Sequence, residues 1–140
     1  MANPKLTMHY CALRDAAELS RVLVHHRAVV NCYDASGRAP LHDAPERASM
    51  DALLRAGGDP NARARDGTTP LHAAAARGDG RAVEALLGLG ASPRARDVTL
   101  GNTPLHVTSD WRCARALCAG GADVEAIRDS DGLAPLHAAA

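Results

Sequence analysis

The tripeptide Pro-Leu-His occurs four times in the chain, and its spacing constrains the fold more than any other feature. It begins at positions 40, 70, 104 and 135, so the intervals are 30, 34 and 31 residues. A glycine precedes each copy by three residues, at Gly37, Gly67, Gly101 and Gly132. A period of about 20 to 50 residues is typical of proteins that stack one small unit many times. The spacing therefore predicts a stack of repeats.

One unit, residues 66–97, is complete enough to predict its elements. Thr69 is placed as a helix N-cap, and Pro70 takes the first helical position, where its missing N–H costs nothing. A second helix is predicted over residues 81–87, because the apolar side chains there follow helical spacing, and Gly90 ends it. Each unit is therefore expected to be a helix, a turn and a second helix packed back on the first.

These motifs, together with the glycine turns that follow each second helix, resemble ankyrin repeats, which carry Thr-Pro-Leu-His at a period of about 33 residues. The resemblance implies an all-α ankyrin-repeat solenoid of stacked helix-turn-helix units with projecting finger loops. It covers residues 8–140 as a single domain after an N-terminal tail of residues 1–7, with repeats at about 8–36, 37–66, 67–100 and 101–131 and a partial repeat at 132–140. The motif residues are Pro40, Leu41, His42, Thr69, Pro70, Leu71, His72, Thr103, Pro104, Leu105, His106, Pro135, Leu136 and His137.

The repeats differ in length. From the histidine position to the last apolar residue of the second helix there are 15 residues in the repeat at 67–100 and 12 in the others. Three missing residues are nearly one helical turn, so we expect a shortened first helix or a tighter interhelical loop in the short repeats. Pro45 would interrupt a helix that starts at Pro40. Trp111, the single tryptophan, is predicted to lie in such a loop, either as a contact anchor or as a filler of the missing turn.

The composition and the motifs argue against catalysis, cofactors and bulk-charge binding. The 16 basic and 16 acidic residues cancel, so no nucleic-acid partner is expected. No apolar run approaches the roughly 18 to 20 residues that span a bilayer, so no membrane partner is expected. No G-x-S-x-G, phosphate-loop or H-E-x-x-H motif indicates an enzyme. Successive motif histidines would lie about 8 to 10 Å apart, too far to share a zinc ion, so no metal or other cofactor is expected.

The resemblance implies instead that the motif histidine bonds to the threonine of its own motif and to the backbone of an adjoining repeat. It also implies that another protein is the partner, bound on a concave face made of fingers and first helices. A line of guanidinium groups there would take carboxylates of the partner bidentately, although such arginines could equally serve solubility alone. The candidate partner-binding residues are Arg38, Arg63, Arg65, Thr68, Arg94, Arg96, Val98, Leu100, Asn102 and Arg128.

Two further functions stay open on the sequence. The last repeat stops inside its first helix, so the chain could self-associate through this uncapped C-terminal end, or it could be a piece of a longer protein. Ankyrin proteins with irregular repeats include viral host-range proteins and substrate receptors of cullin-type ubiquitin ligases, whose box would lie outside this chain. The expected location is the cytoplasm or nucleus, or the host cytoplasm for a viral protein. Asn31 and Asn61 resemble the context of ankyrin asparagine hydroxylation.

Overall fold

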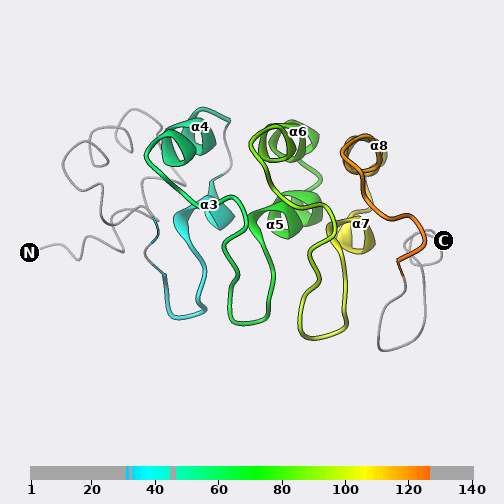
Figure 1. The fold of residues 1–140 in the computed structure, drawn as a ribbon, viewed down its shortest axis with the longest axis horizontal. Coiled ribbons are helices and arrows are strands. Elements are labelled where there is room, and N and C mark those ends of the chain that lie inside the picture. The colour runs from blue at the N-terminus through cyan, green and yellow to red at the C-terminus, as the bar shows by residue number, and fades with distance from the viewer. Residues whose placement is uncertain (1–30, 32, 45–46, 127–140) are drawn as a thin grey trace, which may run out of the picture.

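The computed structural model describes residues 31, 33–44 and 47–126, and these form two rows of helices with loops projecting from one row (Figure 1). One row holds the first helices of the repeats, α3 (Pro40–Asp43), α5 (Pro70–Arg77) and α7 (Pro104–Val107). The other holds the second helices, α4 (Arg47–Arg55), α6 (Gly80–Gly88) and α8 (Trp111–Ala119). No strand occurs among the described residues. The stack of repeats predicted from the spacing, and the all-α architecture implied by the family resemblance, are confirmed over this part of the chain.

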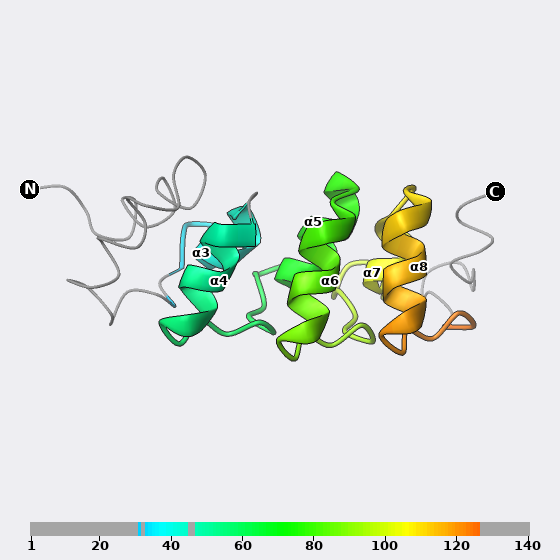
Figure 2. The same cartoon turned by 90° about the horizontal axis from the view of Figure 1, so that it is seen from above.

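Contacts run from each helix to its partner in the same repeat and to the equivalent helix in the next. Helix α5 packs on α6 within its repeat and on α3 and α7 to either side, while α6 packs on α4 and α8. Seen from above, the second helices lie side by side in chain order (Figure 2). The core is therefore built locally, between neighbouring repeats, as expected of a solenoid.

The interior is filled by aliphatic side chains at equivalent positions of successive repeats. Leu53, Leu86 and Leu117 of the second helices and Leu71 of α5 are at most 1% exposed, as is Met50. Alanines fill the space between them, and the small alanine side chain lets helices of neighbouring repeats approach closely. Each buried leucine or methionine contributes about 1.5 to 3 kcal/mol relative to an exposed one.

The three described second helices end in the same turn, which explains the glycines that recur there. Gly57, Gly90 and Gly121 have φ angles of 99°, 96° and 95°, a left-handed conformation that glycine adopts without a steric penalty. The N–H of the following residue donates to a carbonyl in the last turn of the helix, at 2.8, 3.0 and 2.9 Å in the three repeats. This is the Schellman arrangement, which satisfies carbonyls that the helix end leaves open. The predicted helix end at Gly90 is confirmed.

The first helices differ in length as the repeat intervals do. Helix α5 has eight residues, whereas α3 and α7 have four each. A shortened first helix, one of the two expected solutions, is therefore the one adopted at α3 and α7. Ala44, which follows α3 and precedes Pro45, has an extended ψ of 111°, as a residue before proline prefers. The corresponding prediction for the first repeat lies outside the described residues.

The longer helix α5 also stabilises the end of the shorter helix beside it. Arg77, the last residue of α5, donates from Nη1 to the carbonyl of His42 at 3.0 Å and from Nη2 to the carbonyl of Ala44 at 3.2 Å. Both carbonyls belong to fully buried residues at the end of α3. The guanidinium therefore supplies hydrogen bonds that a further helical turn of α3 would otherwise have made.

Candidate functional site

The motif histidines link each repeat to the next. His42 Nε2 bonds to the carbonyl of Thr68 at 3.0 Å, and His72 Nε2 bonds to the carbonyl of Asn102 at 2.9 Å. Their Nδ1 atoms accept the backbone N–H of Ala39 at 3.1 Å and of Thr69 at 3.2 Å, so Nε2 carries the proton of the neutral ring. Burial lowers the pKa of both histidines below the ordinary value of 6.5. They are neutral structural links at pH 7.

The threonine of the motif contributes where it is present. The hydroxyl oxygens of Thr69 and Thr103 lie 2.9 Å from Nδ1 of His72 and His106, the contact implied by the family resemblance. Ala39 takes the threonine position before α3, and no side-chain capping bond is made there. The cap of α3 therefore lacks a hydroxyl that is worth about 1 kcal/mol in other helices.

The finger loops are held to one another by backbone hydrogen bonds. The Arg65 N–H donates to the carbonyl of Ser36 at 3.0 Å, and the Val98 N–H donates to the carbonyl of Asp66 at 2.8 Å. These bonds join the tip of each described finger to the tip of the next. Side chains carried by successive fingers are thereby held in a fixed order along one side of the molecule.

The finger at residues 92–101 is longer by one residue, and Asp97 organises the insertion. The turn closes between Asp97 N–H and Asn102 carbonyl, five residues apart, whereas the preceding finger closes between Ala64 and Thr68, four apart. The Asp97 carboxylate accepts from the backbone N–H groups of Leu100 and Asn102 and from the Asn102 side chain, at 3.0 to 3.1 Å. Burial acts to raise the pKa of Asp97, but these hydrogen bonds outweigh it and the pKa is lowered.

Asn102 was predicted to face a partner, and the structure contradicts this. Asn102 is 8% exposed, and its side-chain amide donates to the Asp97 carboxylate at 3.0 Å. Asn102 precedes the Pro-Leu-His motif as Thr68 does, but the sequence pattern gave no sign that Asp97 would hydrogen-bond to it inside the longer turn. Thr68, at the shorter turn, is half-buried, and its hydroxyl donates to Asp66 at 2.6 Å. This bond lowers the pKa of Asp66.

A row of side-chain hydrogen bonds crosses the base of the fingers and shows which finger residues are equivalent. Asn31 donates to the carbonyl of Gly57 at 3.1 Å, and Asn61 donates to that of Gly90 at 3.0 Å. Arg94 donates to Gly121 at 3.1 Å. Arg94 is therefore the equivalent of the two asparagines, and Arg63 matches Arg96. Both Asn61 and Arg94 follow a proline, and the extra residue of the longer finger comes after this point.

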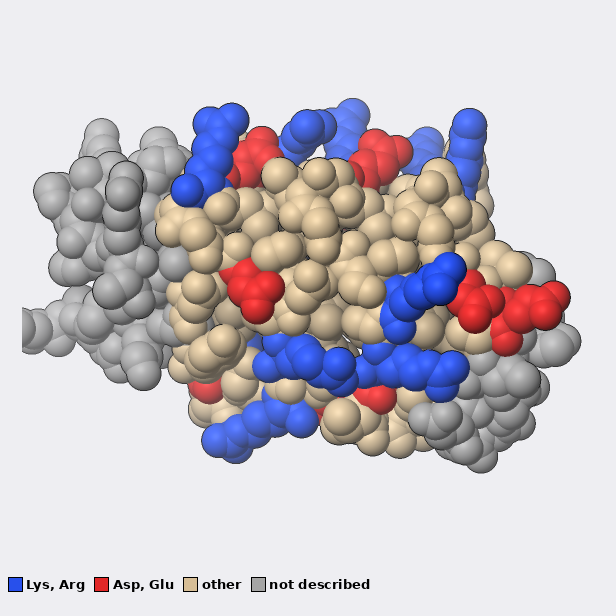
Figure 3. Space-filling view, in the orientation of Figure 1, with Lys and Arg blue, Asp and Glu red and all other residues tan. Residues whose placement is uncertain are grey.

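Four finger arginines remain exposed in this arrangement, and they gather on one side of the molecule. Figure 3 shows basic side chains in a band across the level of the finger loops, below the rows of helices. Arg63 donates to the carbonyl of Arg96 at 2.6 Å, so it also links two fingers. The exposed members are Arg63, Arg65, Arg94 and Arg96.

The row of first helices adds a hollow beside these fingers. It measures about 520 Å³ and lies over α5, between the shortened helices α3 and α7. Arg38 pairs with Asp43 at 2.7 Å on one wall. Ala73, Ala76 and Val107 provide small or apolar lining. The hollow is open because the flanking helices are short and because Ala73 and Ala76 of α5 are small.

Val98 and Leu100, two of the candidate partner-binding residues, lie in the turn of the longer finger. Val98 is 67% exposed and Leu100 is 42% exposed. Val98 also packs beside the neighbouring finger, since a side chain built on Gly67 would meet its Cγ1 at 2.9 Å. The geometry is therefore compatible with local packing and with an exposed contact surface. The remaining predicted residues, Arg128, Pro135, Leu136 and His137, lie outside the described residues, as does the C-terminal end proposed for self-association.

Trp111 departs from its predicted place. It is the first residue of α8, not part of the interhelical loop, and it is 65% exposed, so it does not fill the space left by a missing turn.

Of the cysteines in the described part, Cys113 is buried and Cys118 is exposed, and both are free. Within residues 31, 33–44 and 47–126 there is no cluster of three potential metal ligands. The helices described there are all too short or too polar to cross a bilayer.

Comparison with known proteins identifies the repeat. A family model for ankyrin repeats, in three copies, matches residues 44–126, which is more than half of the chain. The chain belongs to the ankyrin-repeat family. Ankyrin repeats generally mediate protein–protein interaction, and they are typically non-enzymatic.

Two curated relatives share the ankyrin repeats of this chain over most of its length. Human inversin is 35% identical over 106 residues, which are 74% of this chain and 10% of inversin. The mouse ankyrin repeat and SOCS box protein 16 is 34% identical over 93 residues, 66% of this chain and 20% of that protein. The chain thus spans a fifth or less of the length of these relatives.

Proposed function

We propose that this ankyrin-repeat chain is a non-catalytic recognition module that binds a carboxylate-bearing segment of a partner protein through its fingers and first helices. The observation that carries the proposal is the set of exposed arginines on fingers whose tips are hydrogen-bonded to one another. Guanidinium groups bind carboxylates bidentately, and a rigid support lowers the entropy lost on binding.

The neighbouring features suit the same partner. The hollow over α5 could receive a side chain, with Arg38 and Asp43 at its wall. Val98 and Leu100 at the tip of the longer finger offer an apolar contact next to the arginines. A protein-binding surface usually combines apolar anchors with arginine in this way.

The test must remove charge without loosening the fingers. The side chains of Arg63 and Arg94 each bond to the next finger or turn, so the variant of choice is Arg65→Glu with Arg96→Glu. The Arg65 N–H that binds Ser36 and the Arg96 carbonyl that binds Arg63 are main-chain groups, which these substitutions retain. The control is Arg47→Glu with Arg55→Glu, two exposed arginines on α4, in the other row of helices.

Tagged wild-type and variant chains would be used to capture proteins from cells of the natural source, and captured proteins would be quantified by mass spectrometry. We expect the finger variant to lose at least ~10-fold of the specific partner and the α4 variant to retain it, with equal thermal stability. Equal capture by both variants would exclude the finger arginines as the binding site.

The similarity to an ankyrin repeat and SOCS box protein supports a second proposal, that the chain is the substrate-receptor part of a cullin-type ubiquitin ligase. The box that joins such a receptor to its ligase would lie outside this chain. The natural full-length protein, precipitated from its source cells, would then bring down a cullin, and the present chain alone would not. Absence of any cullin from the full-length precipitate would contradict this role.

A further inference from the structure

A second groove lies between the second helices α6 and α8, on the other side of the first helices from the fingers. It has a volume of about 730 Å³. Gly80, at the start of α6, allows the helices to approach closely there, since a side chain built on it would lie 3.2 Å from the Cβ of Arg112. Gly80 and Ala116 give the groove a lining of small residues, and larger side chains stand around them.

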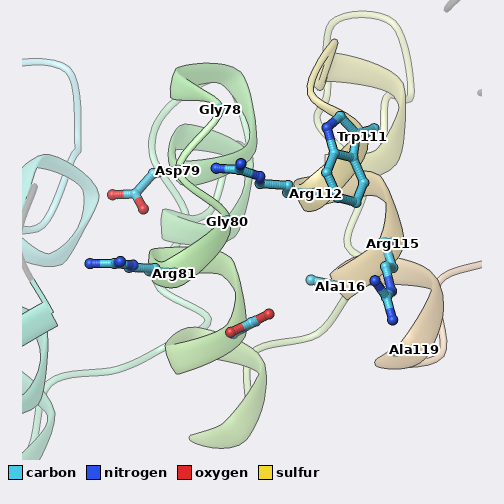
Figure 4. Close-up of a pocket in the computed structure, with 10 residues that line it drawn as sticks. Gly78, Asp79, Gly80, Arg81, Trp111, Arg112, Arg115, Ala116 and Ala119 are labelled. Carbon is cyan, nitrogen blue, oxygen red and sulfur yellow. The ribbon is translucent and has the colours of Figure 1, made fainter.

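Trp111 makes this groove unlike an ordinary gap between helices. Its ring is 65% exposed, and the guanidinium of Arg112 lies 5.5 Å from the ring centroid. Figure 4 shows Arg112 extending from α8 toward Gly78 and Gly80, with Trp111 and Arg115 on the α8 side. A large exposed aromatic ring next to arginines is the side-chain combination that dominates binding energy in protein interfaces.

The charges around the groove favour an acidic ligand. In Figure 4, Asp79 and Arg81 point away from α8, which leaves Arg112 and Arg115 on the α8 side. Among the described residues, neither of these two arginines has a carboxylate oxygen within 4.0 Å. The α6 side of the lining carries acidic Asp79 and Glu84 and basic Arg81, whereas both charged side chains of the α8 side are arginines. The carboxylates of an acidic ligand would therefore bind at the α8 wall.

At two exposed positions α8 carries residue types that differ from those of the other two second helices, α4 and α6. Six residues before the turn glycine, α4 and α6 carry Asp51 and Glu84, and α8 carries Arg115. Ten residues before the turn glycine, α4 and α6 carry Arg47 and Gly80, and α8 carries Trp111. Neither change is required for packing, because both side chains are exposed.

We propose that the groove between α6 and α8 binds an acidic peptide segment of a partner protein, with its carboxylates on Arg112 and Arg115 and an apolar side chain against Trp111. The α8 wall supplies two guanidinium groups with no carboxylate partner in the described structure, and the indole supplies the apolar contact. The site is independent of the finger surface, since the first helices separate the two (Figure 1).

The single tryptophan makes the site directly observable. Because Trp111 is the only tryptophan in the chain, its fluorescence reports on this groove alone. The full chain would be titrated with a capped peptide Glu-Glu-Leu-Glu-Glu and with the matched peptides in which lysine or serine replaces glutamate. An oligothymidylate of eight nucleotides would be titrated in parallel.

We expect a saturable fluorescence change with the glutamate peptide, which weakens as salt is raised because exposed charges are screened. Arg112→Gln with Arg115→Gln should weaken binding at least ~10-fold, whereas Arg47→Gln with Arg55→Gln should not. Trp111→Ala, measured by calorimetry, should also lose binding while keeping wild-type helix content and melting temperature.

Three results would overturn the proposal: no saturable response to the glutamate peptide, an equal or larger response to the lysine peptide, or unchanged binding in the Arg112 and Arg115 variant. Tighter binding of the oligothymidylate than of the glutamate peptide would assign the groove to nucleic acid instead. The finger variant Arg65→Glu with Arg96→Glu should leave the fluorescence titration unchanged, so the two surfaces are tested separately.

Discussion

Replacement of Arg77 by methionine tests whether the long repeat stabilises the short one before it. Methionine keeps an unbranched apolar stem but removes both bonds from the guanidinium to the carbonyls of His42 and Ala44. Both acceptor residues are fully buried, so water cannot replace the guanidinium easily. The substitution should therefore lower the free energy of unfolding.

The size of the loss follows from the two bonds. A hydrogen bond to a charged group contributes about 1.5 to 3 kcal/mol, which gives about 3 to 6 kcal/mol for two bonds in a buried setting. The variant should recover part of this free energy, because Arg77 is exposed to solvent and because Arg38 also donates to the His42 carbonyl, at 3.4 Å. We expect a net loss of about 2 kcal/mol.

Equilibrium unfolding in urea would measure it. With a slope of about 2 kcal/mol per molar urea, the midpoint should fall by about 1 M without a change in slope. Arg81→Met is the control, because Arg81 is exposed on α6 and no hydrogen bond or ion pair of its side chain occurs in the described part of the chain. It should shift stability by less than about 0.5 kcal/mol.

Hydrogen exchange would locate the effect. If the capping argument holds, the opening free energies should fall most in α3 and α4, the repeat that receives the bonds. Equal midpoints for the Arg77 and Arg81 variants would refute the reasoning, as would a loss confined to α8.

Two other predictions concern glycine and pH. Gly67→Ala should destabilise the fold by more than about 1 kcal/mol, because φ at this position is +79° and the new Cβ would lie 2.9 Å from Val98. Gly88→Ala should stabilise it by about 0.5 to 1 kcal/mol, because alanine favours the helix α6 and no atom lies within 4 Å of the new Cβ. Thermal melts of both would check this, and the same sign for both would contradict it. The folded-state pKa values of His42 and His72 are lowered from 6.5, so their stabilisation is present above pH 6.5 and is lost as pH falls below it toward the folded values. Between pH 6.5 and 5.5 the free energy of unfolding should fall by at most about 1.4 kcal/mol per histidine. A urea midpoint that stays constant from pH 7.5 to 5.5 would show that the two histidines have the same pKa in the folded and unfolded chain.

The repeat architecture could be predicted from the sequence because its determinants are local. Proline at the first helical position, glycine at the helix end and leucine at helical spacing act within a few residues of one another, and each appears where predicted. The shortened first helices followed from the same counting, since three residues are nearly one turn.

The surface residues were harder to predict, because their exposure depends on contacts between repeats. Asn102 and Thr68 precede the same motif, yet Asn102 is buried by a carboxylate that the longer turn brings to it. Arg94 matches Asn61 rather than Arg63 because the extra finger residue follows it instead of preceding it. The prediction of a loop at Trp111 was wrong because Asp110 is the N-cap of α8: its carboxylate accepts from the Arg112 N–H, so the helix begins at Trp111.

The side-chain links made by the fingers and by the motif histidines run in one direction along the described repeats, whereas the bonds from Arg77 to the end of α3 run the opposite way. Asn31, Asn61 and Arg94 donate to carbonyls of the repeat that follows, and so do His42, His72 and Arg63. Every one of these acceptors is a main-chain oxygen, which each residue type possesses. A repeat can therefore change its exposed side chains without breaking the link from the repeat before it. The bonds that a repeat receives from the repeat before it therefore stay the same when its own side chains change on the surfaces proposed to bind partners.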